Sequence, residues 1–132
     1  EEKGKFYLFV KSNPNPDNLL LLVSDHVNGK FERVEGFDDS MGAQTKGMYE
    51  APTAVKLADG RWCLFADFYG AGCAGQGYVP FVSDDLTKGV FTRADEAFHF
   101  PYGFKHGTIL PITEEEYERM LARDWTDVPD LR

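Results

Sequence analysis

The chain repeats itself at an interval of 56 to 60 residues, and this repeat restricts its fold more than any other feature. The segment GKFYLFV at residues 4–10 resembles GRWCLFA at residues 60–66, and each is an aromatic-rich strand pattern that follows a glycine. Further along, VSDHVNGKFERVE at 23–35 resembles VSDDLTKGVFTRAD at 82–95. Each copy therefore predicts a strand, a loop, a second strand, a Ser-Asp turn and a third strand around Phe31 or Phe91.

A third pair of segments adds one more strand to the unit. YEAPTAV at 49–55 and KHGTILP at 105–111 both precede the place where the aromatic strand is expected, and they put Glu50 and His106 at equivalent positions. Four antiparallel strands repeated at this period indicate the blades of a β-propeller, because one such sheet cannot bury both faces without neighbours. The first strand of each blade lines the central channel. We therefore expect Glu50 and His106 to face one shared pocket.

The predicted fold is all-β: a propeller fragment of about two to three four-stranded antiparallel blades in a single partial domain, residues 1–132, with a short C-terminal helix. Residues 1–45 form one blade, 46–100 the next, and 101–112 the channel strand of a third. The segment TEEEYERMLA at 113–122 predicts the helix, because Thr113 and Glu116 have the spacing of a capping box. The tail at 123–132 is expected to be irregular.

The composition excludes several classes of partner. The 132 residues carry a net charge of −8 at pH 7, which repels nucleic acid. The longest apolar run, LLLLV at 19–23, is far shorter than the roughly 20 residues that span a bilayer, so no membrane partner is expected. Cys63 and Cys73 match no metal-ligand spacing. We expect two free thiols, which favour a reducing, cytoplasmic compartment.

Three stretches together resemble glycoside hydrolase family 43 and its arabinosidase- and xylosidase-like relatives: YEAPTAVKLADGRWCLFADFYG, GYVPFVSDDLTKGVF and KHGTILPITEEEYERML. The similarity covers nearly the whole chain, which corresponds to about the C-terminal half of a family member. It implies a five-bladed propeller whose axial pocket hydrolyses plant-type glycans containing arabinose or xylose, with inversion. It also implies three carboxylates: an Asp as general base, an Asp that tunes the acid, and a Glu as general acid, to which Glu50 corresponds.

The two aspartates of that set have no counterpart in these 132 residues. An inverting hydrolase needs a protonated acid and an ionised base about 6.5–9.5 Å apart, on either side of a water. We therefore expect little glycosidase activity from this chain alone. Completion is expected from a complementing propeller half or from a homo-oligomer, since two copies of two and a half blades would make five.

Four more residues are candidates for substrate binding: His106, Asp67, Phe68 and Tyr69. The resemblance implies that a histidine near this place lies under the sugar site, where it can contact a central metal ion or a water. No residue is assigned as a metal ligand and no other cofactor is expected. An aromatic ring at the pocket mouth can stack on the apolar face of a sugar. Alternatively, residues 67–69 are turn residues with an aromatic ring packed between blades.

Two alternatives for the function remain open. The first is a non-catalytic carbohydrate-binding or structural propeller remnant. The second is a phosphorylase-like relative, which would need a basic pocket for phosphate; Lys46, Arg61 and Lys105 are the nearby candidates.

Overall fold

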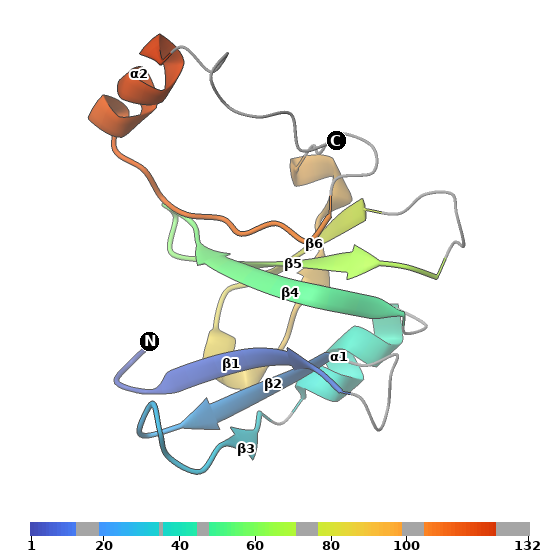
Figure 1. Ribbon diagram of the computed structural model, residues 1–132. Helices are drawn as coiled ribbons and strands as arrows, with labels where there is room; N and C mark the ends of the chain where they lie inside the picture. The colour runs from blue at the N-terminus through green and yellow to red at the C-terminus, as the bar shows by residue number, and fades with distance from the viewer. Residues whose placement is uncertain (13–18, 35, 45–47, 71–76, 99–104, 124–132) are drawn as a thin grey trace.

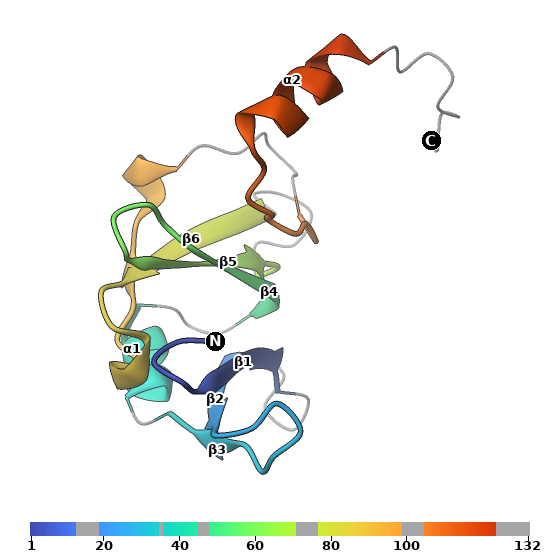
Figure 2. The same ribbon diagram turned by 90° about the vertical axis from the view of Figure 1, so that its left-hand side faces the viewer.

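Two antiparallel β-sheets stack face to face in the computed structural model of this chain, which describes residues 1–12, 19–34, 36–44, 48–70, 77–98 and 105–123 (Figures 1 and 2). The first sheet has three strands in the order β1-β2-β3, and the second has four in the order β4-β5-β6-β7. Strands that follow one another in sequence are neighbours in the sheet. The strands are β1 (Phe6–Lys11), β2 (Leu19–Ser24), β3 (Glu32–Arg33), β4 (Tyr49–Lys56), β5 (Trp62–Phe68), β6 (Gly77–Ser83) and β7 (Thr92–Arg93).

The repeat in the sequence is a repeat in the structure. β1 and β5 are the two aromatic strands, and β2 and β6 both end at the serine of the Ser-Asp turn. The third strand of each copy begins just after Phe31 or Phe91. The all-β prediction is confirmed, and the two meanders are consistent with a propeller-blade fragment. The first sheet contains no counterpart of β4 among the described residues.

The core lies between the two sheets, and β5 is buried on both faces. Successive side chains of a strand point to opposite faces. Leu64 and Ala66 pack toward the first sheet, whereas Cys63 and Phe65 pack on the far side, where Ile109 contributes to their cluster. The second sheet is therefore a middle layer, with the first sheet on one face and the segment after residue 104 on the other.

Three phenylalanines join the two sheets and the helix α1 (Phe37–Gln44). The rings of Phe9, Phe37 and Phe91 meet edge to face, with centroids 5.5 to 5.9 Å apart. The Ser40 hydroxyl donates to the Phe91 carbonyl at 2.9 Å and accepts from the Phe91 amide at 2.8 Å. These contacts fix α1 against the segment that leads into β7.

The helix α1 is a departure from the prediction, which assigned residues 1–45 to one blade without a helix. Its apolar residues Phe37 and Met41 are four apart, so both lie on one face and both are buried in the core. Asp38 and Asp39 lie in its first turn, where the helix dipole favours negative charge. The segment is too short for its periodicity to stand out in the sequence.

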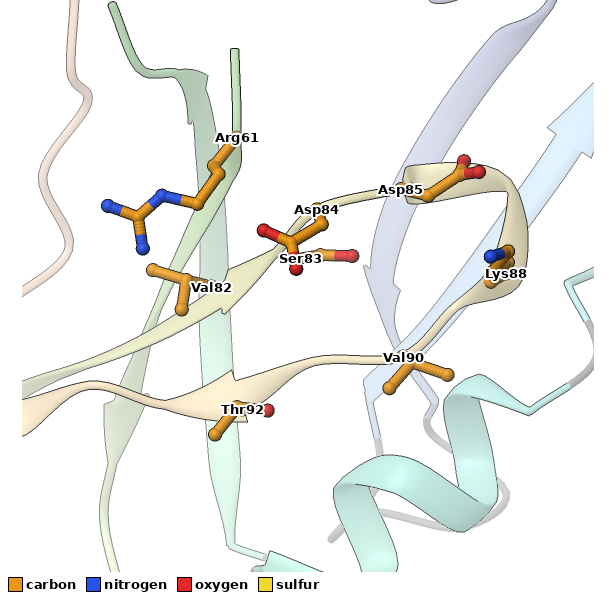
Figure 3. A pocket seen from close by; sticks show the side chains of 8 residues that line it. All are labelled: Arg61, Val82, Ser83, Asp84, Asp85, Lys88, Val90 and Thr92. Atoms are coloured by element: carbon orange, nitrogen blue, oxygen red, sulfur yellow. The ribbon is translucent and has the colours of Figure 1, made fainter. Parts of the chain in front are cut away.

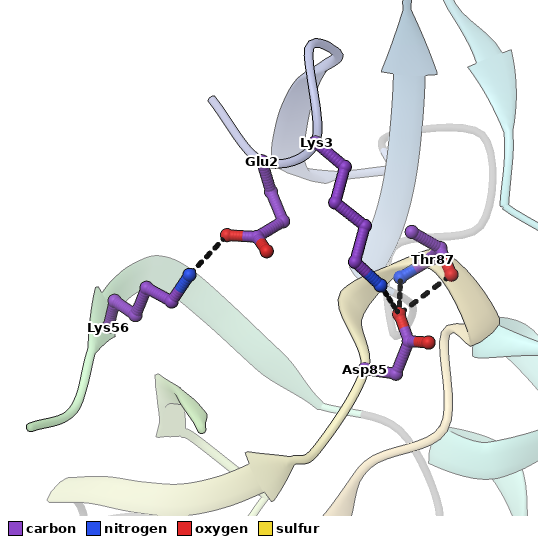
Figure 4. Close-up of polar contacts among 5 residues, drawn as sticks. All are labelled: Glu2, Lys3, Lys56, Asp85 and Thr87. Carbon is purple, nitrogen blue, oxygen red and sulfur yellow. Dashed lines mark hydrogen bonds and ion pairs between the residues drawn. The ribbon is translucent and has the colours of Figure 1, made fainter. Parts of the chain in front are cut away.

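Charged side chains near the N-terminus add a second connection between the sheets (Figure 4). Glu2 accepts from Lys56 of β4 at 2.6 Å, and Lys3 contacts Asp85 at 3.4 Å. Asp85 also caps the 3₁₀ helix η1 (Leu86–Lys88), because its carboxylate accepts from the Thr87 amide and hydroxyl. Exposed pairs of this kind each contribute at most about 1 kcal/mol, so the apolar core dominates the contact.

The third blade is not represented by a strand. Residues 105–112 are extended but pair with no strand of the described chain, and residues 101–104 lie outside the described residues. An extended segment forms a ladder only where a neighbouring strand offers its backbone groups, and the described residues offer none here. The blade boundaries therefore stay predictions.

The C-terminal helix is confirmed as α2 (Glu114–Ala122), and it projects away from the sheets (Figure 2). Thr113 caps it, and Glu116 returns a hydrogen bond to the Thr113 amide, which completes the capping box. None of its residues is buried. No helix in the described part of the chain is long and apolar enough to cross a membrane. The tail predicted at 123–132 lies almost wholly outside the described residues.

Cys63 is a free, fully buried thiol in β5, and burial raises its pKa to about 12. Because the thiolate is the reactive form, we expect native protein at pH 8 to leave Cys63 unmodified by iodoacetamide, and unfolded protein to react within minutes. Mass spectrometry of the peptide that contains Cys63 measures this. Rapid labelling in native buffer would contradict the buried position. Cys73 lies outside the described residues.

Candidate functional site

Glu50 lies at the start of β4, where the strand is irregular. The register with β5 shifts between Glu50 and Thr53, and Ala51 adopts a left-handed backbone conformation with φ of 45°. Bulges of this kind turn a side chain away from the direction it would have in a regular strand. The preceding Tyr49 is buried against Phe68, so the bulge separates a packing residue from a carboxylate that stays partly exposed.

Two basic side chains contact the Glu50 carboxylate from different parts of the chain. Lys11, the last residue of β1, places its Nζ 3.1 Å from Oε2. His106 places its Nε2 3.6 Å from Oε1. The Lys11 ammonium also lies 4.7 Å from the centre of the Tyr69 ring, a cation–π distance. Glu50 thus lies between the Lys11 ammonium and the His106 imidazole.

Asp67 is paired with Glu50 across the β4–β5 ladder, but its side chain is only 1% exposed. Its Oδ2 accepts a hydrogen bond from the His106 amide at 3.0 Å and lies 3.4 Å from Nε2 of the same residue. Its Oδ1 is buried and has no hydrogen-bond partner among the described residues. Burial raises the pKa of Asp67, and the His106 amide and the charges of His106 and Lys105 partly oppose the rise.

His106 has an unusual backbone conformation for a residue with a side chain. Its φ is 54°, in the left-handed region, and such conformations cost about 1–3 kcal/mol unless the surroundings enforce them. The described chain has four non-glycine residues with positive φ: Lys3, Met48, Ala51 and His106. Lys11, Glu50, Asp67 and His106 are referred to below as the Glu50 cluster. Three of the four positive-φ residues, Met48, Ala51 and His106, flank this cluster or belong to it. Strain concentrated at one place is typical of functional sites.

The structure brings together Glu50, His106 and Asp67 of the candidates from the sequence. Phe68 lies elsewhere, because its ring packs on Tyr49 with centroids 5.2 Å apart and belongs to the core. Tyr69 borders the cluster through Lys11. The catalytic and binding roles of these residues stay predictions.

Sequence reasoning missed two residues of the site, Lys11 and Tyr78. Extending the alignment of 4–10 with 60–66 by one position pairs Lys11 with Asp67, so the repeat itself contains the signal. The Tyr78 hydroxyl donates to the Gly107 carbonyl at 2.6 Å, directly beside His106. The Tyr78 ring packs on Phe65. Its hydroxyl additionally holds the His106 segment.

Asp67 does not have the properties of a second catalytic carboxylate for inversion. Such a pair needs a water between the two carboxyl groups. Here one imidazole nitrogen lies within 3.6 Å of both carboxylates, and Asp67 is closed to solvent. The same burial argues against direct contact between Asp67 and a sugar.

The described residues contain no group of three or more His, Cys, Asp or Glu placed to hold a metal ion. The donor set around His106 therefore gives no support to a central metal, and no step is assigned to one. Of the basic residues considered for phosphate, Arg61 lies at the opposite end of the β4–β5 hairpin and Lys46 lies outside the described residues.

A cavity of about 440 Å³ lies at that opposite end of the second sheet (Figure 3). It contains none of the residues in the Glu50 cluster. The Glu50 cluster and the cavity lie toward opposite ends of β4, and the six residue steps from Glu50 to Lys56 span about 20 Å of strand. The lining residues are Arg61, Val82, Ser83, Asp84, Asp85, Lys88, Val90 and Thr92.

The raised pKa of Asp67 predicts a pH-dependent stability difference from the variant Asp67→Asn. Between the ordinary pKa of 3.8 and the raised value, the folded protein binds more protons than the unfolded chain, so its free energy of unfolding falls as the pH rises. Asparagine does not titrate. We expect Asp67→Asn to gain stability relative to wild type between pH 3 and pH 7, measured by urea unfolding. A constant difference would contradict the raised pKa. The charged or titratable groups that face Asp67 are Glu50, Tyr78, Lys105 and His106.

A family model described as a probable glycosyl hydrolase domain, of the type related to glycosyl hydrolase family 43, matches residues 1–118. This match covers most of the chain, including both sheets and all residues of the Glu50 cluster. No curated protein and no solved structure matches the chain.

Proposed function

Because the chain belongs to the family of probable glycosyl hydrolase domains related to family 43, we propose that it is the part of an inverting glycosidase that carries the general acid. The proposed substrates are plant-type glycans that contain arabinose or xylose. The observation that carries the proposal is the convergence of Glu50, Asp67 and His106 from three separate segments, with Lys11 from the other sheet.

In the proposed reaction, Glu50 donates a proton to the glycosidic oxygen as the bond from that oxygen to the anomeric carbon breaks. A water attacks the anomeric carbon from the opposite face, and a base accepts its proton. A sugar hydroxyl that binds the Lys11 ammonium would draw it away from Oε2 of Glu50. The exposed imidazole of His106 and the ring of Tyr69 are the proposed sugar contacts.

The base is proposed to come from outside the Glu50 cluster, and the edge of β1 that pairs with no strand in the described part of the chain indicates where. Leu8 of β1 is 43% exposed, whereas its counterpart Leu64 in β5, which packs toward the first sheet, is fully buried. A cavity of about 320 Å³ lies beside this edge, lined in part by Tyr7, Leu8 and Thr53. An unpaired edge is a template for another strand. We propose that a strand from a second copy or from a complementing propeller half pairs there.

The alternative is a carbohydrate-binding or structural propeller without catalysis. One observation favours it: the Glu50 side chain lies 3.1 Å from the Lys11 ammonium, and an acidic and a basic group placed together can bind sugar hydroxyls without transferring a proton. Aromatic and charged side chains at a channel mouth suit either function.

Hydrolysis and association are tested together. Light scattering after size-exclusion chromatography determines the assembly, and a stable monomer would contradict a role for a second copy. Aryl arabinofuranosides and xylosides are then supplied to that assembly, and NMR of the first product identifies its anomer. The proposal predicts the inverted anomer. Sugar binding without turnover would overturn the enzyme and leave the carbohydrate-binding alternative.

A further inference from the structure

The side chain of Asp67 is directed at a single residue. One oxygen, Oδ2, accepts from the His106 amide at 3.0 Å and also lies 3.4 Å from the imidazole Nε2. The carboxylate therefore contacts both the backbone and the side chain of His106. It reaches them from β5, 39 residues earlier in the chain. Since Asp67 is 1% exposed, a sugar in the site would meet His106 and not Asp67.

His106 needs such support, because a left-handed backbone is unfavourable for a residue that carries a Cβ atom. The segment that contains it has no ladder partner among the described residues. Two hydrogen bonds and one apolar contact hold it to the second sheet. These are the bond from the His106 amide to Asp67, the bond from the Tyr78 hydroxyl to the Gly107 carbonyl at 2.6 Å, and the packing of Ile109 on the cluster around Phe65.

We propose that Asp67 is a positioning residue, which holds His106 in its left-handed conformation and thereby directs the imidazole toward the Glu50 carboxylate. This inference rests on the proposed function for its catalytic consequence, and on the geometry alone for its structural part.

Burying a carboxylate at this position costs more free energy than is needed to accept the hydrogen bond from the His106 amide. An asparagine would accept the same hydrogen bond from the His106 amide without any charge to bury. The raised pKa of Asp67 reflects that cost. What the carboxylate supplies and an amide does not is negative charge beside the imidazole. The negative charge of Asp67 therefore attracts the His106 imidazole, and its oxygen accepts the hydrogen bond from the His106 backbone amide.

Three variants separate these effects. Asp67→Ala removes both the negative charge and the hydrogen-bond acceptor, and Asp67→Asn keeps the acceptor for the His106 amide. Tyr78→Phe removes the hydrogen bond to the Gly107 carbonyl and leaves Asp67 intact. Asp59→Asn is the matched control, because Asp59 is an exposed aspartate that pairs with Arg61 at the other end of the hairpin. Thermal unfolding of each variant shows that it is folded before it is compared.

Hydrogen exchange of the His106 amide, followed by NMR, tests the structural part without any activity. We expect Asp67→Ala to lose about tenfold or more in protection, Tyr78→Phe to lose less because the bond to Asp67 remains, and Asp67→Asn and Asp59→Asn to stay within about threefold of wild type. Unchanged protection in Asp67→Ala would overturn the proposal.

Kinetics on the assembled enzyme test the consequence. We expect Asp67→Ala to lower kcat by about 10- to 100-fold, because the displaced imidazole no longer lies against Glu50, and to raise KM as well, because His106 is a proposed sugar contact. Asp67→Asn should recover part of the loss. A rise in KM at constant kcat would overturn positioning in favour of a direct sugar contact. If wild type does not turn over, the proposed function fails, and the exchange result still decides the role of Asp67.

Discussion

Replacing Glu50 with glutamine is expected to lower kcat for aryl arabinofuranosides or xylosides by about 10²–10⁴-fold, the range that a general acid contributes. Glutamine has nearly the same shape as glutamate but no proton to donate. It keeps an oxygen for Lys11 and a polar contact for His106, so the site is expected to stay assembled. The measurement is steady-state release of the aryl group by the assembly that light scattering identifies.

The choice of leaving group distinguishes an acid from a base. A dinitrophenyl group leaves without protonation, so the loss in Glu50→Gln should be much smaller for that substrate than for a methyl or nitrophenyl glycoside. An equal loss for all leaving groups would contradict proton donation. Glu114→Gln is the matched control, since Glu114 is exposed in the first turn of α2, and it should keep wild-type activity.

Replacing Phe91 with alanine is expected to lower the free energy of unfolding by about 3–5 kcal/mol, the cost of removing a buried phenylalanine ring from a core. The Phe91 ring is buried and meets both Phe9 and Phe37 edge to face, so its loss affects β1, α1 and the second sheet together. A domain of this size has about 5–15 kcal/mol of stability in total. Urea unfolding followed by tryptophan fluorescence measures the change.

Val90→Ala is the control for this prediction, because Val90 precedes Phe91 in the chain but is 55% exposed. It should change the free energy of unfolding by no more than about 0.5 kcal/mol. If Phe91→Ala costs less than about 1 kcal/mol, the three phenylalanines do not form the joint between the sheets.

The strand order could be predicted because the repeat provides it twice. A meander pairs each strand with its neighbour in sequence, so two copies of one pattern gave two sheets of the expected order. Helix α1 could not be predicted from the repeat, since among the described residues the second copy has η2 (Asp95–Ala97) after its last strand in place of a helix of that length. The segment 105–112 aligns with β4 but forms no strand, because pairing depends on a partner that an alignment does not show.

The sequence anticipated that two of the candidate residues lie close together, and their roles stay predictions. The equivalence of Glu50 and His106 in the repeat anticipated that they lie together, and they contact at 3.6 Å. Asp67 was predicted to bind substrate or, alternatively, to be a turn residue, and the sequence did not indicate that it is buried. Its burial depends on residues about 40 positions later, which pass over the end of β5 and cover it. Such coverage is a tertiary effect that no local pattern of residues contains.

The central claim is that sugar binds at the Glu50 cluster, and NMR titration of the isotope-labelled chain with xylo- and arabino-oligosaccharides tests it most directly. We predict that the largest shift changes fall on the amides of Lys11, Glu50, Tyr69 and His106, and that they saturate together. Changes confined to Arg61, Ser83 and Asp84 at the opposite cavity, or no saturable change at any residue, would contradict the claim.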